Sequence, residues 1–182
     1  MQIHILPTAI EIFLAVLVLV AAIYDFRYRR IPNWLVVTGI CAGFALNGFF
    51  FGLGGLGRAG AGFGLAAAIY LPMFALRAMG GGDVKLMVAV GSLAGASNWF
   101  VLFLITAVVG GIMAVGLLLV RGGFSRTVLN VLRIPRALLR LRAPYRDHPE
   151  LDVTHSTAVT LPHGVSIAVG TLLFIALSHG VG

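Results

Sequence analysis

Two aspartates at the edges of long apolar stretches are the residues of this chain best suited to acid–base chemistry. Asp83 follows three consecutive glycines, 80–82, and precedes an uncharged run over 86–120. Asp25 directly follows the apolar stretch 8–24. Ionisable groups beside such stretches are costly to keep there, so they are functional candidates.

Two carboxylates that lie close together do not both ionise cheaply, so they share a proton. The ionised one then activates water as a base, while the protonated one polarises a carbonyl, as in aspartic proteases. A structural role is the alternative. Asp83 would then cap the helix that follows it, and Asp25 would pair with nearby arginines. The residue types alone leave both roles open.

The composition identifies the elements that must position these carboxylates. Hydrophobic residues make up 59% of the 182 residues, charged residues 10%, and the mean hydropathy is +1.02. A soluble domain carries roughly 25% charged residues, so this chain is built for lipid. About 20 apolar residues cross a membrane as one helix, and the polar triplet "SNW" at 97–99 divides the longest uncharged run. We expect one all-α, polytopic domain over 1–182, a bundle of six transmembrane helices at 8–24, 34–53, 59–79, 84–97, 99–120 and 162–179.

The basic residues predict the orientation of this bundle. The leader "MQIH" has no Lys or Arg and "DFRYRR" after the first helix has three, which is the reverse of a secretory signal, so we expect a retained helix. Twelve of the 13 basic residues fall on one side: Arg27, Arg29, Arg30, Arg77, Lys85, Arg121, Arg126, Arg133, Arg136, Arg140, Arg142 and Arg146. The positive-inside rule puts that side in the cytoplasm and both termini outside the inner (plasma) membrane. The net charge of +7 is therefore a topology signal, and we expect no nucleic-acid partner.

The loop 121–161 is the one long connection. Its first half has apolar residues among spaced arginines and a bend at Pro135, which is typical of an amphipathic segment lying on the inner leaflet. A docking surface for a partner is the alternative. The polar second half holds residues of metal-binding type, but their spacing matches no ligand pattern: His148, Glu150, Asp152 and His155. The single Cys41 excludes a disulfide framework or a Cys-based zinc site. We expect no metal and no cofactor.

Glycines recur four residues apart, a spacing that lets helices pack closely in lipid: Gly39/Gly43, Gly48/Gly52, Gly60/Gly64 and Gly91/Gly95. The glycines before Asp83 allow unusual backbone shapes and leave room for another chain to pass. Lys85 either snorkels to the membrane surface or orients Asp83.

The segments "YDFRYRRIPNWL" (24–35) and "GGGDVKLM" (80–87) together resemble the prepilin peptidases, membrane aspartic proteases with a Gly-x-Gly-Asp signature. The first matches the family through Asp25 and the Ile-Pro-Asn of 31–33, and the second through the glycines, Asp83 and Lys85. The late segment "LPHGVSIAVG" (161–170) is similar to the start of the family's final helix, with His163 where an aromatic residue is more usual.

The resemblance implies an aspartic-type endopeptidase that removes the leader peptide of type IV prepilins at the cytoplasmic face, before the apolar N-terminal helix of the pilin. It implies catalytic roles for Asp25 and Asp83. Substrate contacts are expected at Gly80, Gly81, Gly82 and Lys85. Pro32 and Asn33 are expected to shape the turn into the second helix.

The chain resembles the short CpaA/TadV-like form associated with Flp-type pili, because it has one cysteine and lacks the four-cysteine loop of the larger enzymes. The expected partners are the prepilin, membrane lipid and the pilus assembly machinery. Two alternatives are a preflagellin- or presenilin-like protease with another substrate, and a non-catalytic membrane subunit of a pilus or secretion assembly.

Overall fold

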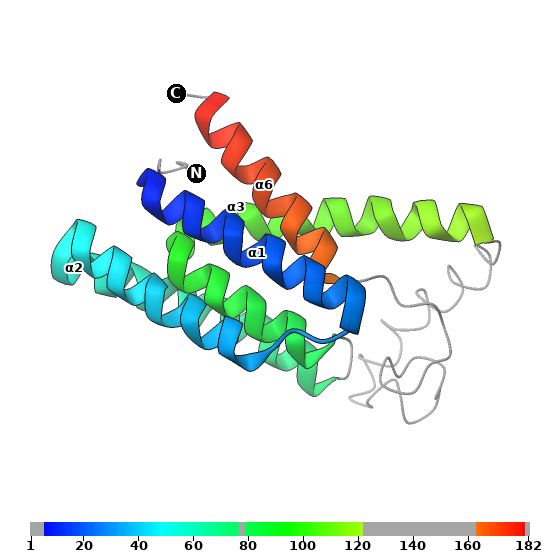
Figure 1. The fold of residues 1–182 in the computed structure, drawn as a ribbon, viewed down its shortest axis with the longest axis horizontal. Coiled ribbons are helices and arrows are strands. Elements are labelled where there is room, and N and C mark those ends of the chain that lie inside the picture. Colours follow the sequence, from blue (N-terminus) through cyan, green and yellow to red (C-terminus); the bar gives the residue numbers. More distant parts are fainter. Residues whose placement is uncertain (1–5, 77–78, 122–162, 181–182) are drawn as a thin grey trace, which may run out of the picture.

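The computed structural model describes residues 6–76, 79–121 and 163–180, and the regular secondary structure in these ranges is helical throughout. Its helices are α1 (Thr8–Tyr28), α2 (Asn33–Ala75), α3 (Gly81–Arg121) and α6 (His163–Gly180), arranged as in Figure 1. The predicted all-helical fold class is therefore confirmed. The amphipathic segment expected in the long loop lies outside the described residues.

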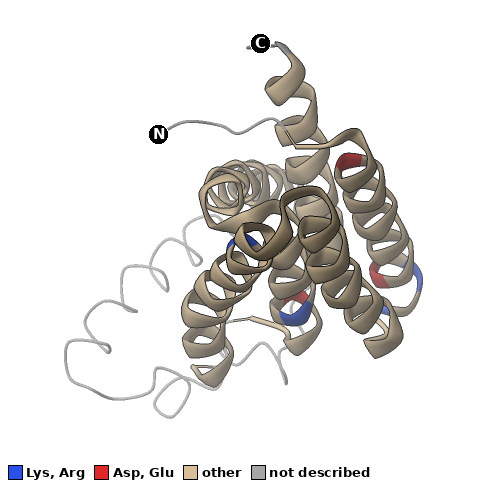
Figure 2. Cartoon of the chain, turned by 90° about the vertical axis from the view of Figure 1, so that its left-hand side faces the viewer, with Lys and Arg blue, Asp and Glu red and all other residues tan. Residues whose placement is uncertain are grey.

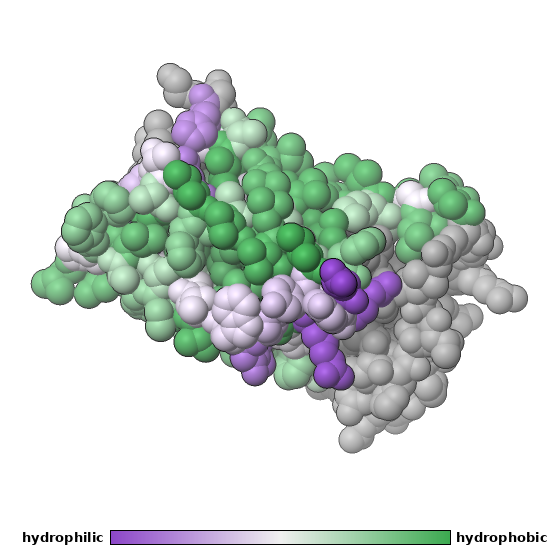
Figure 3. Space-filling view, viewed as in Figure 1, coloured by the Kyte–Doolittle hydropathy of each residue, from purple (hydrophilic) through white to green (hydrophobic). Residues whose placement is uncertain are grey.

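Three of these helical elements are long and apolar enough to cross a membrane: α1, α2 and the part of α3 that spans Gly81–Leu117. The fourth, α6, is apolar but shorter. The face seen in Figure 3 is largely apolar, and hydrophilic residues gather along its lower edge. Water-soluble monomers rarely expose contiguous apolar patches larger than a few hundred Å², so this surface is that of a membrane protein.

The two longest helices are each broken at one glycine. A straight helix of 43 residues, the length of α2, would extend about 65 Å, whereas the hydrocarbon core is about 30 Å thick. Gly52 in α2 has φ 60° and ψ −143°, and Gly95 in α3 has φ 76° and ψ 164°. A positive φ is strained for residues that carry a Cβ. Glycine therefore lets the chain turn sharply at these two points.

These breaks correct the helix boundaries expected from the sequence. The predicted helices join in pairs, 34–53 with 59–79 in α2 and 84–97 with 99–120 in α3. The turn in α3 lies at Gly95, and residues 97–99 are helical. Trp99 is fully buried, and its indole N–H donates a hydrogen bond of 3.0 Å to the carbonyl of Met87. This packing keeps the polar triplet inside a helix.

Both halves of α2 pack against the same turn of α3. A methyl group added at Gly43, in the first half, would overlap Ser92, and one added at Gly62, in the second half, would overlap the backbone of Gly91. The side-chain amide of Asn47 donates to the carbonyl of Ser92 at 3.1 Å. Helix α2 therefore doubles back on itself, so that both halves lie beside the first half of α3 (Figure 1).

The glycines spaced four residues apart differ in their surroundings. Gly39 and Gly43 lie in close contact with neighbouring helices, as expected. A Cβ added at Gly60 or Gly64 would meet no atom of another part of the chain nearer than 4.0 Å. Gly62 between them makes the close contact instead. A shift of two residues turns the contact to the other side of a helix with 3.6 residues per turn, so spacing alone identified the wrong face here.

Helices α1 and α6 lie side by side and cover the α2–α3 pair (Figure 1). Near one end of the two helices, Glu11 Oε2 and His179 Nε2 lie 2.8 Å apart. In Figure 2 two of the described acidic residues lie near the other end, each close to a basic residue. The bundle therefore holds its carboxylates at two separate levels.

Candidate active site

Asp25 lies in the last turns of α1, where its carboxylate meets the start of α6. The helix continues to Tyr28, four residues beyond the predicted end, and stops because Arg29 adopts the left-handed conformation. Only 9% of the Asp25 surface is exposed, and its Oδ2 accepts a hydrogen bond of 2.8 Å from the backbone N–H of Gly164. The first N–H groups of a helix have no partner within that helix. The Asp25 carboxylate accepts a hydrogen bond from one such N–H group at the start of α6.

Gly164 is required for this contact. A Cβ added at Gly164 would lie 2.8 Å from the Cβ of Asp25 and 2.9 Å from its Oδ2. Real Cβ atoms do not approach so closely, so the carboxylate or the helix would have to move. Sequence reasoning noted the segment around His163 but did not connect it with Asp25. The two residues are 139 positions apart, and no spacing rule links them.

Asp83 lies in the first turn of α3 and is half-buried. The start of α3 meets the connection that follows α1, where a Cβ on Gly82 would lie 3.3 Å from Ile31, so the structure brings the two carboxylates of the sequence analysis into one region, at the C-terminal end of α1 and the N-terminal end of α3. The pairing of Asp25 with nearby arginines stays an alternative prediction for its role.

The three glycines before Asp83 have different neighbours. A Cβ at Gly80 would lie 3.1 Å from Oδ2 of Asp83, and Gly80 itself is exposed. A Cβ at Gly81 would lie 3.1 Å from the ring of Phe74, and one at Gly82 would lie 3.3 Å from Ile31. The space beside two of these glycines is thus filled by the protein's own side chains. Gly80 is the one that faces outward next to the carboxylate.

Lys85 connects the two sequence motifs directly. Its Nζ donates a hydrogen bond of 3.0 Å to Oδ1 of Asn33, the first residue of α2. The contact of Gly82 with Ile31 forms a second link between the same segments. The sequence analysis considered a snorkelling lysine or one that orients Asp83. In the structure Lys85 holds the start of α2 against the start of α3.

Tyr70 is a residue of this region that sequence reasoning did not single out. It lies in the second half of α2, is 3% exposed, and packs edge-on against Trp99 and Phe103. The available signal was a tyrosine within an apolar helix, because a buried phenol hydroxyl usually has a polar partner. Its position relative to Asp83 depends on how α2 folds back.

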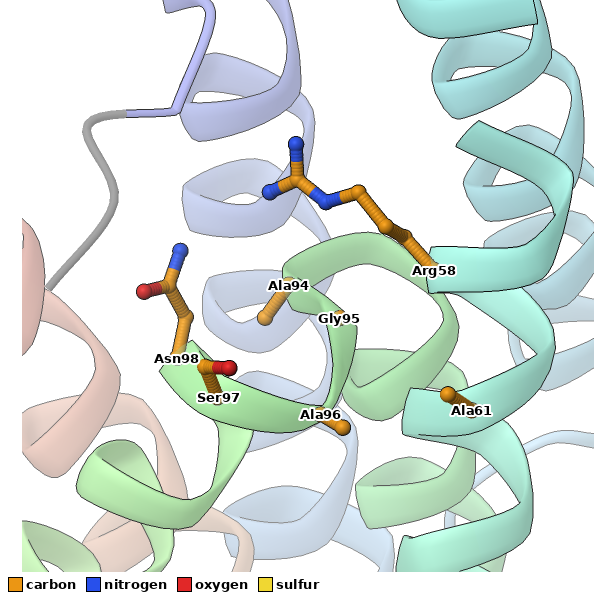
Figure 4. Close-up of a pocket in the computed structure, with 7 residues that line it drawn as sticks. All are labelled: Arg58, Ala61, Ala94, Gly95, Ala96, Ser97 and Asn98. Carbon is orange, nitrogen blue, oxygen red and sulfur yellow. The ribbon is translucent and has the colours of Figure 1, made fainter. Parts of the chain in front are cut away.

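The hollows of the structure differ in chemistry. One of about 390 Å³ lies beside the connection from α1 to α2, and it is lined by Tyr24, Tyr28, Arg30, Ile31, Pro32 and Asn33. Another of about 330 Å³ surrounds the break in α3, where Figure 4 shows Arg58, Ser97 and Asn98 around Gly95. The second is twelve residues, or about 18 Å of helix, from Asp83, and no carboxylate lines it. The first adjoins Asp25 in sequence and includes the partner of Lys85.

In the part of the chain that the structure describes, no group of three or more His, Cys, Asp or Glu side chains lies close enough together to hold a metal ion. The four loop residues weighed as ligands, between His148 and His155, lie outside that part.

The comparisons with known proteins support one family. The model of the type IV leader peptidase family matches residues 12–115, more than half of the 182 residues. No curated protein and no solved structure matches the chain. The matched range includes both aspartates, the three glycines and the lysine described above. The chain belongs to the type IV leader peptidase family.

Proposed function

We propose that this protein is a membrane-embedded aspartic endopeptidase that removes the leader peptide of type IV prepilins, with Asp25 and Asp83 as its catalytic residues. Membership of the family implies a peptidase. The observation that supports the aspartic mechanism is the convergence of two carboxylates from separate helices: Asp25 is buried near the end of α1, and Asp83 lies in the first turn of α3, which meets the α1–α2 connection through Gly82 and Ile31.

The reaction follows from the pairing of these two groups. The ionised aspartate takes a proton from a water molecule, whose oxygen attacks the carbonyl carbon of the scissile peptide bond. The protonated aspartate gives its proton to the carbonyl oxygen. The tetrahedral intermediate then collapses: its C–N bond breaks as the first aspartate gives its proton to the leaving nitrogen, and the second aspartate takes back a proton from a hydroxyl of the intermediate, which becomes the carboxyl carbonyl. Every proton moves between Asp25, Asp83, water and substrate, so no further group is needed.

The substrate chain would pass in extended form beside the glycines that precede Asp83. Gly80 supports this path best, because it is exposed and lies beside the carboxylate. Gly81 and Gly82 would contribute by letting Phe74 and Ile31 approach and shape the wall of the site. Lys85 would contribute through Asn33, which lines the nearby hollow of about 390 Å³.

The breaks in α2 and α3 support a topology of six membrane-crossing segments, since each break divides a helix that is too long for one crossing. With that topology, twelve of the 13 basic residues face the cytoplasm, and so does the site. The protein would then work in the inner membrane, where the leader of a newly made prepilin is accessible and lipid covers the apolar faces of the helices.

The substrate proposed is an Flp-type prepilin, as expected for the short form of the family. The apolar helix that follows a prepilin leader would remain in the bilayer beside the enzyme while the cleavage site reaches the two aspartates. After cleavage the mature pilin would pass to the pilus assembly machinery.

The test is leader cleavage of a co-expressed Flp-type prepilin by the wild type and by Asp83→Asn at equal membrane abundance. We expect the mobility shift of the pilin with the wild type and its loss, by a factor of about 10³, with the variant, because an amide neither accepts nor returns the proton. Undiminished processing by Asp83→Asn would leave Asp83 as a helix cap and overturn the aspartic mechanism.

A further inference from the structure

The hollow of about 330 Å³ at the break in α3 has a positive charge in its wall, and no carboxylate is among the described residues that line it. Its polar lining residues are Arg58, Ser97 and Asn98, and the others are alanines and Gly95. Figure 4 shows these side chains around the bend of the helix. The volume is within the range of small-molecule sites, so the hollow has room for an anionic group beside the guanidinium.

The guanidinium of Arg58 is held in place by an aromatic ring and by the bend itself. Its Cζ lies 4.5 Å from the centroid of the Phe51 ring, a distance at which a cation is attracted to the face of the ring. The side chain also passes close to Gly95, where a Cβ would lie 3.8 Å from Nε. Arg58 is half-buried, and the planar fork of a guanidinium matches the oxygens of a phosphate.

Arg58 is the one basic residue of the chain outside the twelve that the proposed six-crossing topology places in the cytoplasm. In that topology the breaks at Gly52 and Gly95 lie toward the outer surface. Twelve residues, or about 18 Å of helix, separate Asp83 from Gly95, whereas the hydrocarbon core is about 30 Å thick. A guanidinium at this depth is costly unless the bilayer thins or an anion follows it inward. The headgroup phosphate of a lipid is the anion available at that boundary.

Exposed apolar side chains surround the reversal of α2, next to Arg58. Phe49 and Leu53 are 82% and 86% exposed, and Phe50 and Phe51 are exposed as well. Acyl chains of a lipid would lie against these side chains while its headgroup occupied the hollow. Inorganic phosphate would gain nothing from them, so the surroundings favour a lipid over a free anion.

We propose that the hollow at Gly95 binds the headgroup of an anionic phospholipid of the phosphatidylglycerol type. The N–H groups of Arg58 pair with the phosphate, and Ser97 and Asn98 form the polar wall beside the glycerol hydroxyls. A net negative headgroup is preferred over a zwitterionic one, because no carboxylate in the described wall would pair with an ammonium group. The inference goes beyond the peptidase reaction and uses only the topology proposed with it.

The experiment titrates the full-length protein in detergent with phosphatidylglycerol and measures the bound lipid by native mass spectrometry of the folded protein. Arg58→Gln removes the charge. Ala61→Phe keeps the charge and fills the hollow from an exposed lining position. Arg27→Gln is the matched control, because the Arg27 guanidinium also lies over an aromatic ring, that of Tyr28 at 5.8 Å, but near the other end of α1. Phosphatidylcholine and inorganic phosphate are the competitors.

We expect the wild type to bind phosphatidylglycerol, and Arg58→Gln and Ala61→Phe each to raise its dissociation constant about 10-fold, the effect of one charge-assisted contact. Arg27→Gln should stay within a factor of two of wild type, and neither competitor should displace the lipid at equal concentration. Unchanged binding in Arg58→Gln or Ala61→Phe would overturn the site. An equal loss in Arg27→Gln would overturn it as well, since general attraction to basic residues would then explain the binding.

The competitors test which occupant the hollow takes. Displacement by inorganic phosphate would assign the hollow to a free anion and reject the lipid. Displacement by phosphatidylcholine would reject the preference for a net negative headgroup. The assay contains no prepilin, so a failure of the proposed peptidase function, seen as absent leader cleavage, would leave the binding result as it stands.

Discussion

Helix α1 carries a buried carboxylate near each end, and α6 supplies a partner for both. Near the start of α1, Glu11 meets the side chain of His179, which is 59% exposed, at 2.8 Å. Near the end of α1, Asp25 meets the backbone N–H of Gly164, and a second carboxylate, Asp83, lies at the start of α3 in the same region. The two ends therefore share one helix pair and differ in the groups that face the carboxylate.

This difference separates a structural carboxylate from one suited to chemistry. A carboxylate with a basic partner has its charge compensated, and removing either group mainly costs stability. A carboxylate that faces another carboxylate favours a shared proton, which is the requirement for acid–base catalysis. A backbone N–H fixes the orientation of Asp25 without supplying a full positive charge. The packing of α6 on α1 thus provides a hydrogen-bond partner for the carboxylate at each end of α1.

The largest effect should come from matched amide substitutions at the two ends, Asp25→Asn and Glu11→Gln. We expect Asp25→Asn to lower prepilin cleavage about 10³-fold, because the amide cannot take part in proton transfer, with little change in thermal unfolding. Glu11→Gln should keep wild-type cleavage per folded enzyme. It should lower the unfolding midpoint by about 2–4 °C, the effect of roughly 1 kcal/mol in a protein of this size.

The measurements for this pair are leader cleavage and thermal unfolding in detergent. A reversed pattern, with cleavage lost in a well-folded Glu11→Gln and retained in Asp25→Asn, would contradict the assignment of the two ends.

A smaller effect on cleavage is expected from Gly164→Ala, which changes only the position of Asp25. The added methyl group must displace the carboxylate, and a misplacement of about 1 Å costs on the order of 100-fold in rate. Gly170→Ala is the control on the same helix, because its methyl group would meet the backbone of Thr106 at 2.8 Å, away from the site. We expect both variants to lose about 1–3 kcal/mol of stability from overpacking.

Cleavage per folded enzyme should fall in Gly164→Ala and stay near wild type in Gly170→Ala. Equal rates in the two variants would show that the Gly164 contact does not set the geometry of Asp25.

The smallest effect should come from the exposed hydrogen bond between Lys85 and Asn33. Lys85→Met and Asn33→Ala should each lower cleavage about fivefold, as expected for an exposed interaction of roughly 1 kcal/mol. If the two residues act through their mutual contact, the double variant should lose no more than either single variant. Independent, multiplied losses would instead assign Lys85 a separate contact with substrate.

The sequence predicted the helical class of the protein well, for a clear physical reason. Long apolar stretches have few stable solutions in lipid other than helices. Charges beside such stretches are rare enough to stand out, and in this way Asp25 and Asp83 became the candidate site residues. The helix boundaries were predicted less well, because Trp99 packs into the core and holds a polar triplet in a helix.

The contributions of Gly164 and Gly62 could not be predicted from the sequence. Gly164 meets Asp25 only because α6 returns beside α1, and Gly62 meets Gly91 only because α2 reverses at Gly52. Both contacts depend on the register of helices that are far apart in the chain, and periodicity within one helix contains no information about that register.

By itself, the sequence determined that this chain is helical, that it belongs in a membrane and that Asp25 and Asp83 are its candidates for acid–base chemistry, since hydropathy and charge are properties of each residue. The tertiary structure decided which groups surround those carboxylates. It placed a backbone N–H of α6 on Asp25, and it gave Glu11 a histidine. The reason is that close packing between helices, set by glycines such as Gly43 and Gly62, fixes contacts that no local pattern specifies.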